Sequence, residues 1–171
     1  PSRVSQVSNK FEKILFKLHH REFITHTGIF NNKKISVISS GIGTDNIDIV
    51  LNELDAIVNI DLKTKKINDF KKSLDIVRLG TSGSLNENIN LDTFIASEYA
   101  IGFDGLAHFY DNDIILEKKL QNKFINHTKW DVKHALPYAL KASDNLLKKF
   151  DEIEKGITLT ATGFYAPQTR E

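Results

Sequence analysis

A β-branched run, a glycine turn and an amphipathic stretch follow one another in the first third of this chain, and this succession most constrains its fold. Residues 34–39 predict a strand, which asparagines precede and Gly41 follows. Residues 45–56 carry apolar side chains at helical spacing, and Thr44 or Asp45 is suited to cap the first turn. Strand, tight turn and helix together form the local unit of an α/β fold.

The rest of the chain continues this alternation of extended and helical segments. Residues 4–18 predict a helix over their first part, and residues 15–27 are expected to become extended. The remaining predicted elements are a hairpin (residues 56–62 and 66–70), strands (74–79, 91–97 and 156–162) and helices (114–124 and 136–150). No internal repeat, linker or low-complexity segment interrupts this pattern, so we expect one domain over residues 1–171.

Charge and composition argue against several classes of function. The 171 residues include 23 basic and 22 acidic side chains, a net charge of +1, which gives no reason to expect nucleic acid or an anionic membrane as a partner. The absence of cysteine excludes disulfides and thiolate chemistry. No apolar run approaches the roughly 18 residues of a membrane span, and the first residues are polar, so we expect a cytoplasmic protein.

Two loops have the composition of anion-binding loops. Gly41 and Gly43 lie where the strand hands over to the helix, but the third glycine of a dinucleotide motif is replaced by Asn46, so a simple tight turn is an equal alternative. The second loop begins at Arg78 and continues through Gly80-Thr81-Ser82-Gly83. A guanidinium group, hydroxyl groups and consecutive backbone N–H groups suit phosphate, whereas the alternative is an Arg78 that pairs with a buried carboxylate.

The segment after the last predicted strand carries groups that fit a flat polar ring. Phe164 offers an aromatic face, Gln168 offers one donor and one acceptor group, and Arg170 offers a rigid fork of donors. A ring with two carbonyls that flank an N–H, such as uracil, would use all three. The alternative is a polar strand end with a Gln and an Arg by chance.

Taken together, these segments resemble the nucleoside phosphorylase superfamily and are most similar to the uridine phosphorylases within it. The matching segments, in order, are Pro1-Ser2-Arg3-Val4, His20-Arg21-Glu22-Phe23, Ser40-Gly41-Ile42-Gly43, Arg78-Leu79-Gly80-Thr81-Ser82-Gly83, Asp104-Gly105 and Phe164-Tyr165-Ala166-Pro167-Gln168-Thr169-Arg170. The resemblance implies a three-layer αβα fold around a central, mixed and twisted sheet. The family's Gly-Asp before Pro1 and its ribose-gripping Met-Glu-x-Glu segment are not in this sequence, so we expect the family domain to be incomplete at both ends.

The resemblance also implies a role for individual residues. Those that fall on phosphate ligands are Arg3, Arg21, Gly43, Arg78 and Thr81, with Arg21 reaching into a neighbouring subunit's site and Thr81 also bordering the ribose. Phe164, Gln168 and Arg170 fall on residues that bind the base. No metal is implied, except that Glu22, Ile42 and Asn46 fall where some relatives hold a monovalent cation; a relative has Ser at the position of Asn46.

The implied activity is that of a pentosyltransferase which converts uridine and phosphate to uracil and ribose 1-phosphate, with Arg78, Gln168 and Arg170 in catalytic roles. Phosphate is a co-substrate and no cofactor is expected. The expected assembly is a homodimer or a hexamer built as a trimer of dimers, with sites shared between subunits. The alternatives are a purine nucleoside phosphorylase, a nucleosidase of the same superfamily, and a non-catalytic nucleoside-binding fragment.

Overall fold

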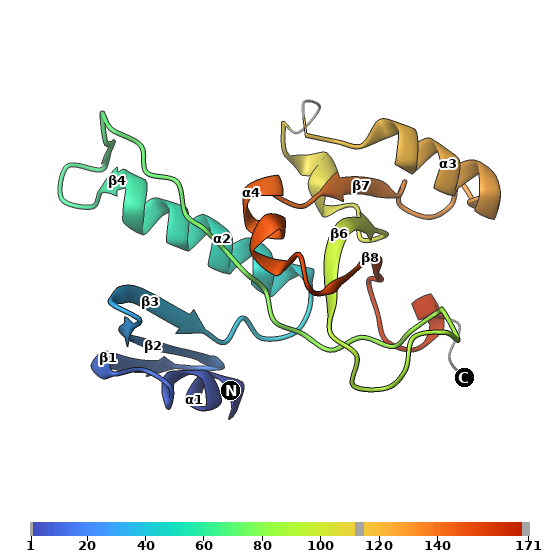
Figure 1. Cartoon of the computed structure of the whole chain (residues 1–171). Coiled ribbons are helices and arrows are strands. Elements are labelled where there is room, and N and C mark those ends of the chain that lie inside the picture. Colours follow the sequence, from blue (N-terminus) through green and yellow to red (C-terminus); the bar gives the residue numbers. More distant parts are fainter. Residues whose placement is uncertain (1, 112–114, 169–171) are drawn as a thin grey trace. The chain divides into compact units, whose positions relative to one another are not determined.

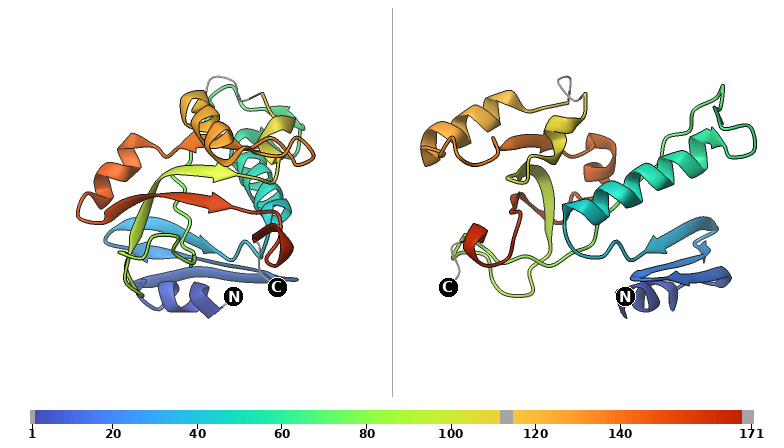
Figure 2. Two further views of the ribbon diagram at one scale, coloured as in Figure 1. Left: turned by 90° about the vertical axis from the view of Figure 1, so that its right-hand side faces the viewer. Right: turned by 180° about the vertical axis from the view of Figure 1, so that it is seen from behind.

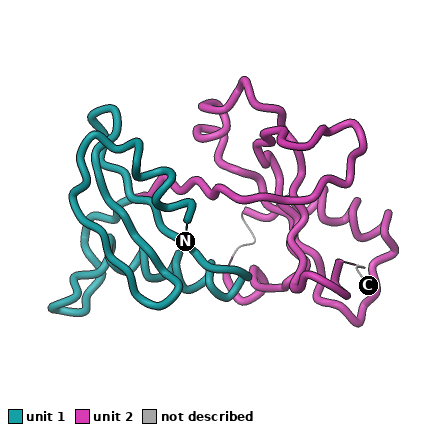
Figure 3. The backbone as a smooth tube through the Cα atoms, turned by 90° about the horizontal axis from the view of Figure 1, so that it is seen from below, with its two compact units in different colours: residues 1–72 teal, residues 73–171 magenta. Residues whose placement is uncertain are grey.

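The computed structural model describes residues 2–111 and 115–168 of the chain. The backbone forms two compact units, Pro1–Lys72 and Ser73–Glu171, and each is described by itself (Figure 3). The expectation of one domain remains a prediction. No described helix combines the length and the apolar character needed to cross a membrane.

The first unit contains an antiparallel three-stranded sheet, two helices and a small hairpin (Figure 1). Its elements are α1 (Ser2–Ser8), β1 (Lys13–His20), β2 (Phe23–Phe30), β3 (Lys33–Ile38), α2 (Thr44–Asn59), β4 (Ile60–Asp61) and β5 (Lys66–Ile67). The turn between β2 and β3 places both Asn31 and Asn32 at positive φ, 47° and 59°. Asparagine tolerates this conformation, which two-residue hairpin turns require, and the turn sets the Phe30–Lys33 register.

The short helix α1 packs against the middle of this sheet. Val4 and Ser8, one turn apart, are each 2% exposed, and the Ser8 Oγ lies 2.7 Å from Nδ1 of His26 on β2. Two residues further along the same strand is Gly28, where a Cβ atom would collide with the Phe11 ring. The missing side chain at Gly28 therefore allows the segment after α1 to lie directly on the sheet.

Helix α2 begins at Thr44, and Gly43 precedes it at φ 95° without a side-chain cap. The prediction that Thr44 or Asp45 is the N-cap was therefore wrong: the chain enters the helix through the glycine, which places Thr44 and Asp45 inside the first turn. At the other end, the buried Asn59 donates to the Lys72 carbonyl and accepts the Lys72 N–H. This amide holds the end of the first unit against α2.

The second unit contains a mixed sheet in the order β7-β6-β8 (Figure 2). Its elements are β6 (Ile95–Gly102), the 3-10 helix η1 (Leu106–Phe109), α3 (Lys118–Thr128), β7 (Tyr138–Lys141), α4 (Asp144–Leu147), the 3-10 helix η2 (Lys148–Phe150), β8 (Glu154–Thr160) and the 3-10 helix η3 (Ala166–Gln168). Strand β6 runs antiparallel to β7 and parallel to β8. The α/β class and the mixed sheet are as predicted.

Two predicted elements of this unit are wrong. Residues 74–79 form no strand, and Leu74, Ile76, Val77 and Leu79 are between 43% and 69% exposed. A β-branched run forms a ladder only where a neighbouring strand accepts it, and no described segment pairs with this one. Residues 136–150 form not one helix but β7, α4 and η2, because Tyr138–Lys141 pairs with β6 and buries Ala139 completely.

The remaining differences concern element ends. Strand β6 starts at Ile95, four residues after the predicted strand start, and α3 runs from Lys118 to Thr128 where residues 114–124 were expected. Residues 112–114 lie outside the described residues. The predicted strands at 34–39 and 156–162 and the helix at 45–56 are confirmed as β3, β8 and α2, each with shifted ends.

The buried His26 predicts a pH dependence of the first unit's stability. Burial, and to a lesser degree the Lys17 ammonium group, lower the pKa of His26, so the folded chain binds its proton less readily than the unfolded chain. Neutral His26 therefore contributes fully to the stability of the first unit above the unfolded pKa of about 6.5. This contribution declines as the pH falls through that value. Replacing His26 by Asn should flatten the decline in melting temperature between about pH 7.5 and 5, and an equally steep decline would contradict this origin.

Candidate functional site

Ser39 connects two of the three segments of the first unit that were predicted to bind phosphate, the one with Arg21 and the one with Gly43. Its hydroxyl donates to the Glu22 carbonyl (2.9 Å) and accepts the Ile24 N–H (2.7 Å), while its own N–H donates to the Ile24 carbonyl (2.9 Å). The turn that holds Arg21 thus lies at the same end of the sheet as the loop that leads to Gly43. Sequence reasoning did not single out Ser39, although a hydroxyl that follows a strand was its visible signal.

The loop between Ser39 and α2 exposes its backbone at two glycines, on either side of the exposed Ile42. Gly41 and Gly43 have φ values of 71° and 95°, so both occupy conformations that favour glycine. A Cβ atom on Gly43 would meet nothing within 4 Å, whereas one on Gly41 would collide with the Asn46 side chain. The open position at Gly43, directly before the N-terminal N–H groups of α2, has the chemistry that attracts an anion.

Two of the three residues that the resemblance implies as cation ligands are hydrogen-bonded to each other. Nδ2 of Asn46 donates to the Ile42 carbonyl at 3.1 Å, and Glu22 is exposed. A monovalent ion at this point would have to share the Ile42 carbonyl with that amide, and its presence remains a prediction. Among the residues the structure describes, there is no group of three or more histidine, aspartate or glutamate side chains that is arranged to hold a metal ion.

Arg3 and Arg21 present their side chains at the surface of the first unit. Arg3 lies on α1 and is exposed, and Arg21 occupies the β1–β2 turn with a φ of 54°. A positive φ at a bulky residue is uncommon and here turns the chain sharply between two paired strands. The first unit therefore carries Arg3, Arg21 and Gly43 of the predicted phosphate ligands.

Arg78 and Thr81 lie in an exposed loop of the second unit. The guanidinium group of Arg78 folds over Gly80, with Nη1 at 3.1 Å from the position that a Cβ of this glycine would take. Arg78 makes no ion pair within the described part of the chain, so the alternative of a partner carboxylate in a buried pair finds no support there. Thr81 is exposed three residues further along.

The predicted base-binding segment closes on itself after β8. Nε2 of Gln168 donates to the Gly163 carbonyl at 3.1 Å, and the Gln168 N–H donates to the Tyr165 carbonyl at 2.9 Å. The Phe164 ring is 60% exposed and meets the Tyr165 ring edge-on, with centroids 5.5 Å apart. This short loop contains both Phe164 and Gln168, while Arg170, the third predicted base ligand, lies outside the described residues.

Asp104 and Tyr138 form a half-buried pair at the end of β6. The Tyr138 hydroxyl donates to both carboxylate oxygens of Asp104, at 2.8 and 3.1 Å, and the Leu106 N–H donates to the same carboxylate at 2.8 Å. Burial and the Asp104 carboxylate raise the pKa of Tyr138 well above its usual range. Asp104 thus shapes the turn with Gly105, and its tyrosine partner was missed because 34 residues separate the two.

This pair lies at the sheet edge from which the base segment departs. Gly102, the last residue of β6, has no room for a Cβ beneath the Tyr138 ring, and the next N–H, that of Phe103, donates to the Thr160 carbonyl at 2.9 Å. Because β6 and β8 are parallel, their carboxyl ends meet at one edge, which is where open α/β sheets bind their ligands.

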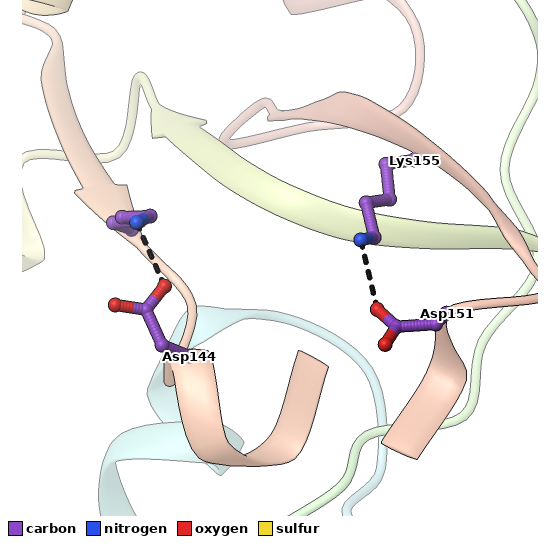
Figure 4. A network of polar contacts seen from close by, with 4 residues as sticks. Asp144, Asp151 and Lys155 are labelled. Atoms are coloured by element: carbon purple, nitrogen blue, oxygen red, sulfur yellow. Dashed lines mark hydrogen bonds and ion pairs between the residues drawn. The ribbon is translucent and has the colours of Figure 1, made fainter. Parts of the chain in front are cut away.

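A polar hollow in this unit has paired rather than convergent charges. It is lined by Glu98, Asp144, Leu147, Lys148, Asp151 and Lys155. Lys141 approaches Asp144 at 2.7 Å and Lys155 approaches Asp151 at 3.1 Å (Figure 4). The Lys141 ammonium lowers the pKa of Asp144, and the carboxylate in turn raises the pKa of Lys141. These exposed pairs are typical of a solvated surface.

Comparison with known proteins places these features in a family. The family model described as Phosphorylase superfamily matches residues 1–171. Uridine phosphorylase of Haemophilus influenzae is 26% identical over 170 residues, which are 99% of this chain and 56% of that protein. A purine nucleoside phosphorylase of the DeoD type from Streptococcus thermophilus is 31% identical over 80 residues, 47% of this chain and 31% of its own length.

A solved structure agrees with these matches over the whole chain. A nucleoside phosphorylase of Trypanosoma brucei, whose crystal structure is described as showing uridine phosphorylase activity, superposes with a TM-score of 0.83 at 27% identity, covering 100% of this chain and 63% of its own. The chain therefore spans less than two thirds of the length of these relatives. It belongs to the phosphorylase superfamily, and within the nucleoside phosphorylases it is close to the uridine phosphorylases.

Proposed function

We propose that the full-length protein catalyses the phosphorolysis of a pyrimidine nucleoside, with uridine and phosphate giving uracil and ribose 1-phosphate. The observation that carries this proposal is the end of the first sheet, where Ser39 holds the Arg21 turn beside the glycine loop and the uncapped start of α2. Backbone N–H groups at a helix start, together with arginine side chains, suit a dianionic co-substrate. Water, the co-substrate of a nucleosidase, needs no arginine.

The proposed chemistry depends on charge stabilisation and positioning. As the bond between ribose and base stretches, the sugar gains positive character and the base gathers negative charge. Arg78, with Arg3, Thr81 and the Gly43 backbone, would hold phosphate on the opposite face of the sugar, which converts an encounter into an oriented attack. Gln168 and Arg170 would donate to the departing base, so that their hydrogen bonds strengthen in the transition state.

The base is proposed to be a pyrimidine because of the segment after β8. Phe164 has an exposed ring on which a flat base can stack, and Gln168 carries both a donor and an acceptor group. The similarity to a purine nucleoside phosphorylase over 80 residues makes a purine nucleoside the second candidate. No cofactor takes part in this scheme.

The site is further proposed to be shared between subunits, with Arg21 serving the phosphate of a neighbour in a dimer or a trimer of dimers. Arg21 is exposed on the tight turn between β1 and β2, a position from which it can reach a second chain. Mixed Arg21→Ala and Arg78→Ala subunits should then recover part of the lost activity, since one shared site keeps both arginines. No recovery after confirmed subunit exchange would argue against sharing.

The first test is the dependence of base release on phosphate. Full-length protein should release uracil from uridine only when phosphate is present, and the sugar product should carry phosphorus detectable by ³¹P NMR. Inosine should react more slowly under the same conditions. Equal release of uracil without phosphate would indicate a nucleosidase, faster release of hypoxanthine would indicate a purine enzyme, and saturable binding without turnover would indicate a binding protein.

The second test separates the two halves of the site by their kinetic effects. Arg78→Ala should raise the KM for phosphate, and Gln168→Ala should lower kcat by about 10²–10³-fold, as the loss of one transition-state donor typically does. Lys155→Ala is the matched control, because this cation of the same unit pairs with Asp151 at the surface. Comparable losses in all three variants would mean that general destabilisation, and not the site, is being measured.

A further inference from the structure

A buried hydrogen bond in the first unit connects α1 to the middle of the sheet. The Ser8 Oγ lies 2.7 Å from His26 Nδ1, and these residues are 2% and 7% exposed. A buried polar group that loses its hydrogen-bond partner lowers the free energy of unfolding far more than an exposed group does, because water cannot replace the partner. This contact therefore fixes one position of the helix relative to the strand. No feature of the proposed reaction accounts for it.

Helix α1 depends on this attachment because it is too short to be stable alone. It has seven residues, whereas an isolated helix needs roughly 12–15 to be even marginally stable in water. Its two buried side chains, Val4 and Ser8, lie one turn apart, and the helix packs against β2 and β3. Figure 1 shows α1 lying against this sheet. The apolar contact of Val4 would allow α1 to shift along the sheet, because such contacts have no preferred direction. The hydrogen bond of Ser8 is directional and prevents this shift.

The same helix carries Arg3, which directly precedes Val4. If Arg3 binds phosphate, the position of its guanidinium group is set by how α1 sits on the sheet. We propose that Ser8 and His26 are positioning residues, which hold α1 in the register that brings Arg3 to the phosphate. This inference rests on the proposed function, and it assigns to the Ser8–His26 pair an effect on phosphate affinity that is separate from its effect on folding.

Ser8→Ala tests the inference most simply, and Ser36→Ala is its matched control. Ser8→Ala removes the bond to His26, while alanine remains compatible with a helix. Ser36→Ala removes the 2.8 Å hydroxyl bond from β3 to Thr27 of β2. Thr27 follows His26 on the strand and so faces the opposite side of the sheet, away from α1. Both variants delete one hydroxyl group, but only Ser8→Ala removes a hydrogen bond between α1 and the sheet.

We expect Ser8→Ala to raise the KM for phosphate by on the order of ten- to a hundred-fold, as a misplaced ligand group does, and to leave the KM for uridine within about twofold. Ser36→Ala should leave both constants near those of the wild type. In an Arg3→Ala background, Ser8→Ala should add nothing further to the phosphate KM, because residues that act through one another are not additive.

If Ser8→Ala does not fold, two variants of His26 test whether the Ser8–His26 hydrogen bond affects the KM for phosphate. In His26→Asn the amide lies near the place of Nδ1 and can keep the bond to Ser8, whereas in His26→Gln it lies near the place of Nε2 and cannot. The phosphate KM should therefore be close to wild type in His26→Asn and raised in His26→Gln. Equal constants in these two variants would overturn the inference.

The outcomes distinguish this inference from the function on which it rests. Base release that is independent of phosphate would overturn both. Phosphate-dependent cleavage with an unchanged phosphate KM in Ser8→Ala, an equal rise in Ser36→Ala, or additive effects of Ser8→Ala and Arg3→Ala would overturn the positioning role alone.

Discussion

The three hydrogen bonds of Ser39 are the constraint on which the proposed phosphate site of the first unit depends. They join Glu22 and Ile24, on either side of the first residue of β2, to the residue after β3, and so fix the Arg21 turn relative to the glycine loop. Each partner is a backbone group, so the arrangement depends on no side chain other than that of Ser39. The turn supplies a cation and the loop supplies backbone N–H groups. Together they can attract an anion only while these hydrogen bonds hold the turn and the loop beside each other.

The second unit also positions a loop by hydrogen bonds at the end of a strand. Its sheet places β6 and β8 in parallel, and the ladder continues one rung beyond β6 through the Phe103 N–H. Tyr138 covers Gly102 and holds Asp104, which stiffens the edge from which the base segment departs. In both units, backbone hydrogen bonds at a strand end position a loop whose side chains or N–H groups are proposed to contact substrate.

The parts of the fold that follow from local patterns were predictable from sequence, and those that depend on distant partners were not. Strand β3, the glycine turn and α2 followed from periodicity and from Gly41 and Gly43 alone. Residues 74–79 have the composition of a strand but lack a described neighbour, and Tyr138–Lys141 looked helical until its pairing with β6 was known. In both segments, the presence or absence of a neighbouring strand determined the structure, and the intrinsic strand or helix propensity of the residues did not.

The candidate site divides in the same way. Gly43, Arg78 and Gln168 could be named from loops of distinctive composition, whereas Arg21 could be named only from the family resemblance. Ser39, His26 and Tyr138 could not, since their partners lie 15 to 34 residues away and only the folded sheet brings them into contact. The residues that would touch substrate were thus more visible in the sequence than the residues that hold them.

The most direct measurement is a crystal structure of the full-length protein with phosphate and uracil bound. Phosphate should contact the guanidinium group of Arg78 and the Gly43 N–H, and uracil should lie beside it on Phe164 with a hydrogen bond to Gln168. Phosphate and uracil in unconnected cavities, or Arg78 and Gln168 turned toward different ones, would contradict it.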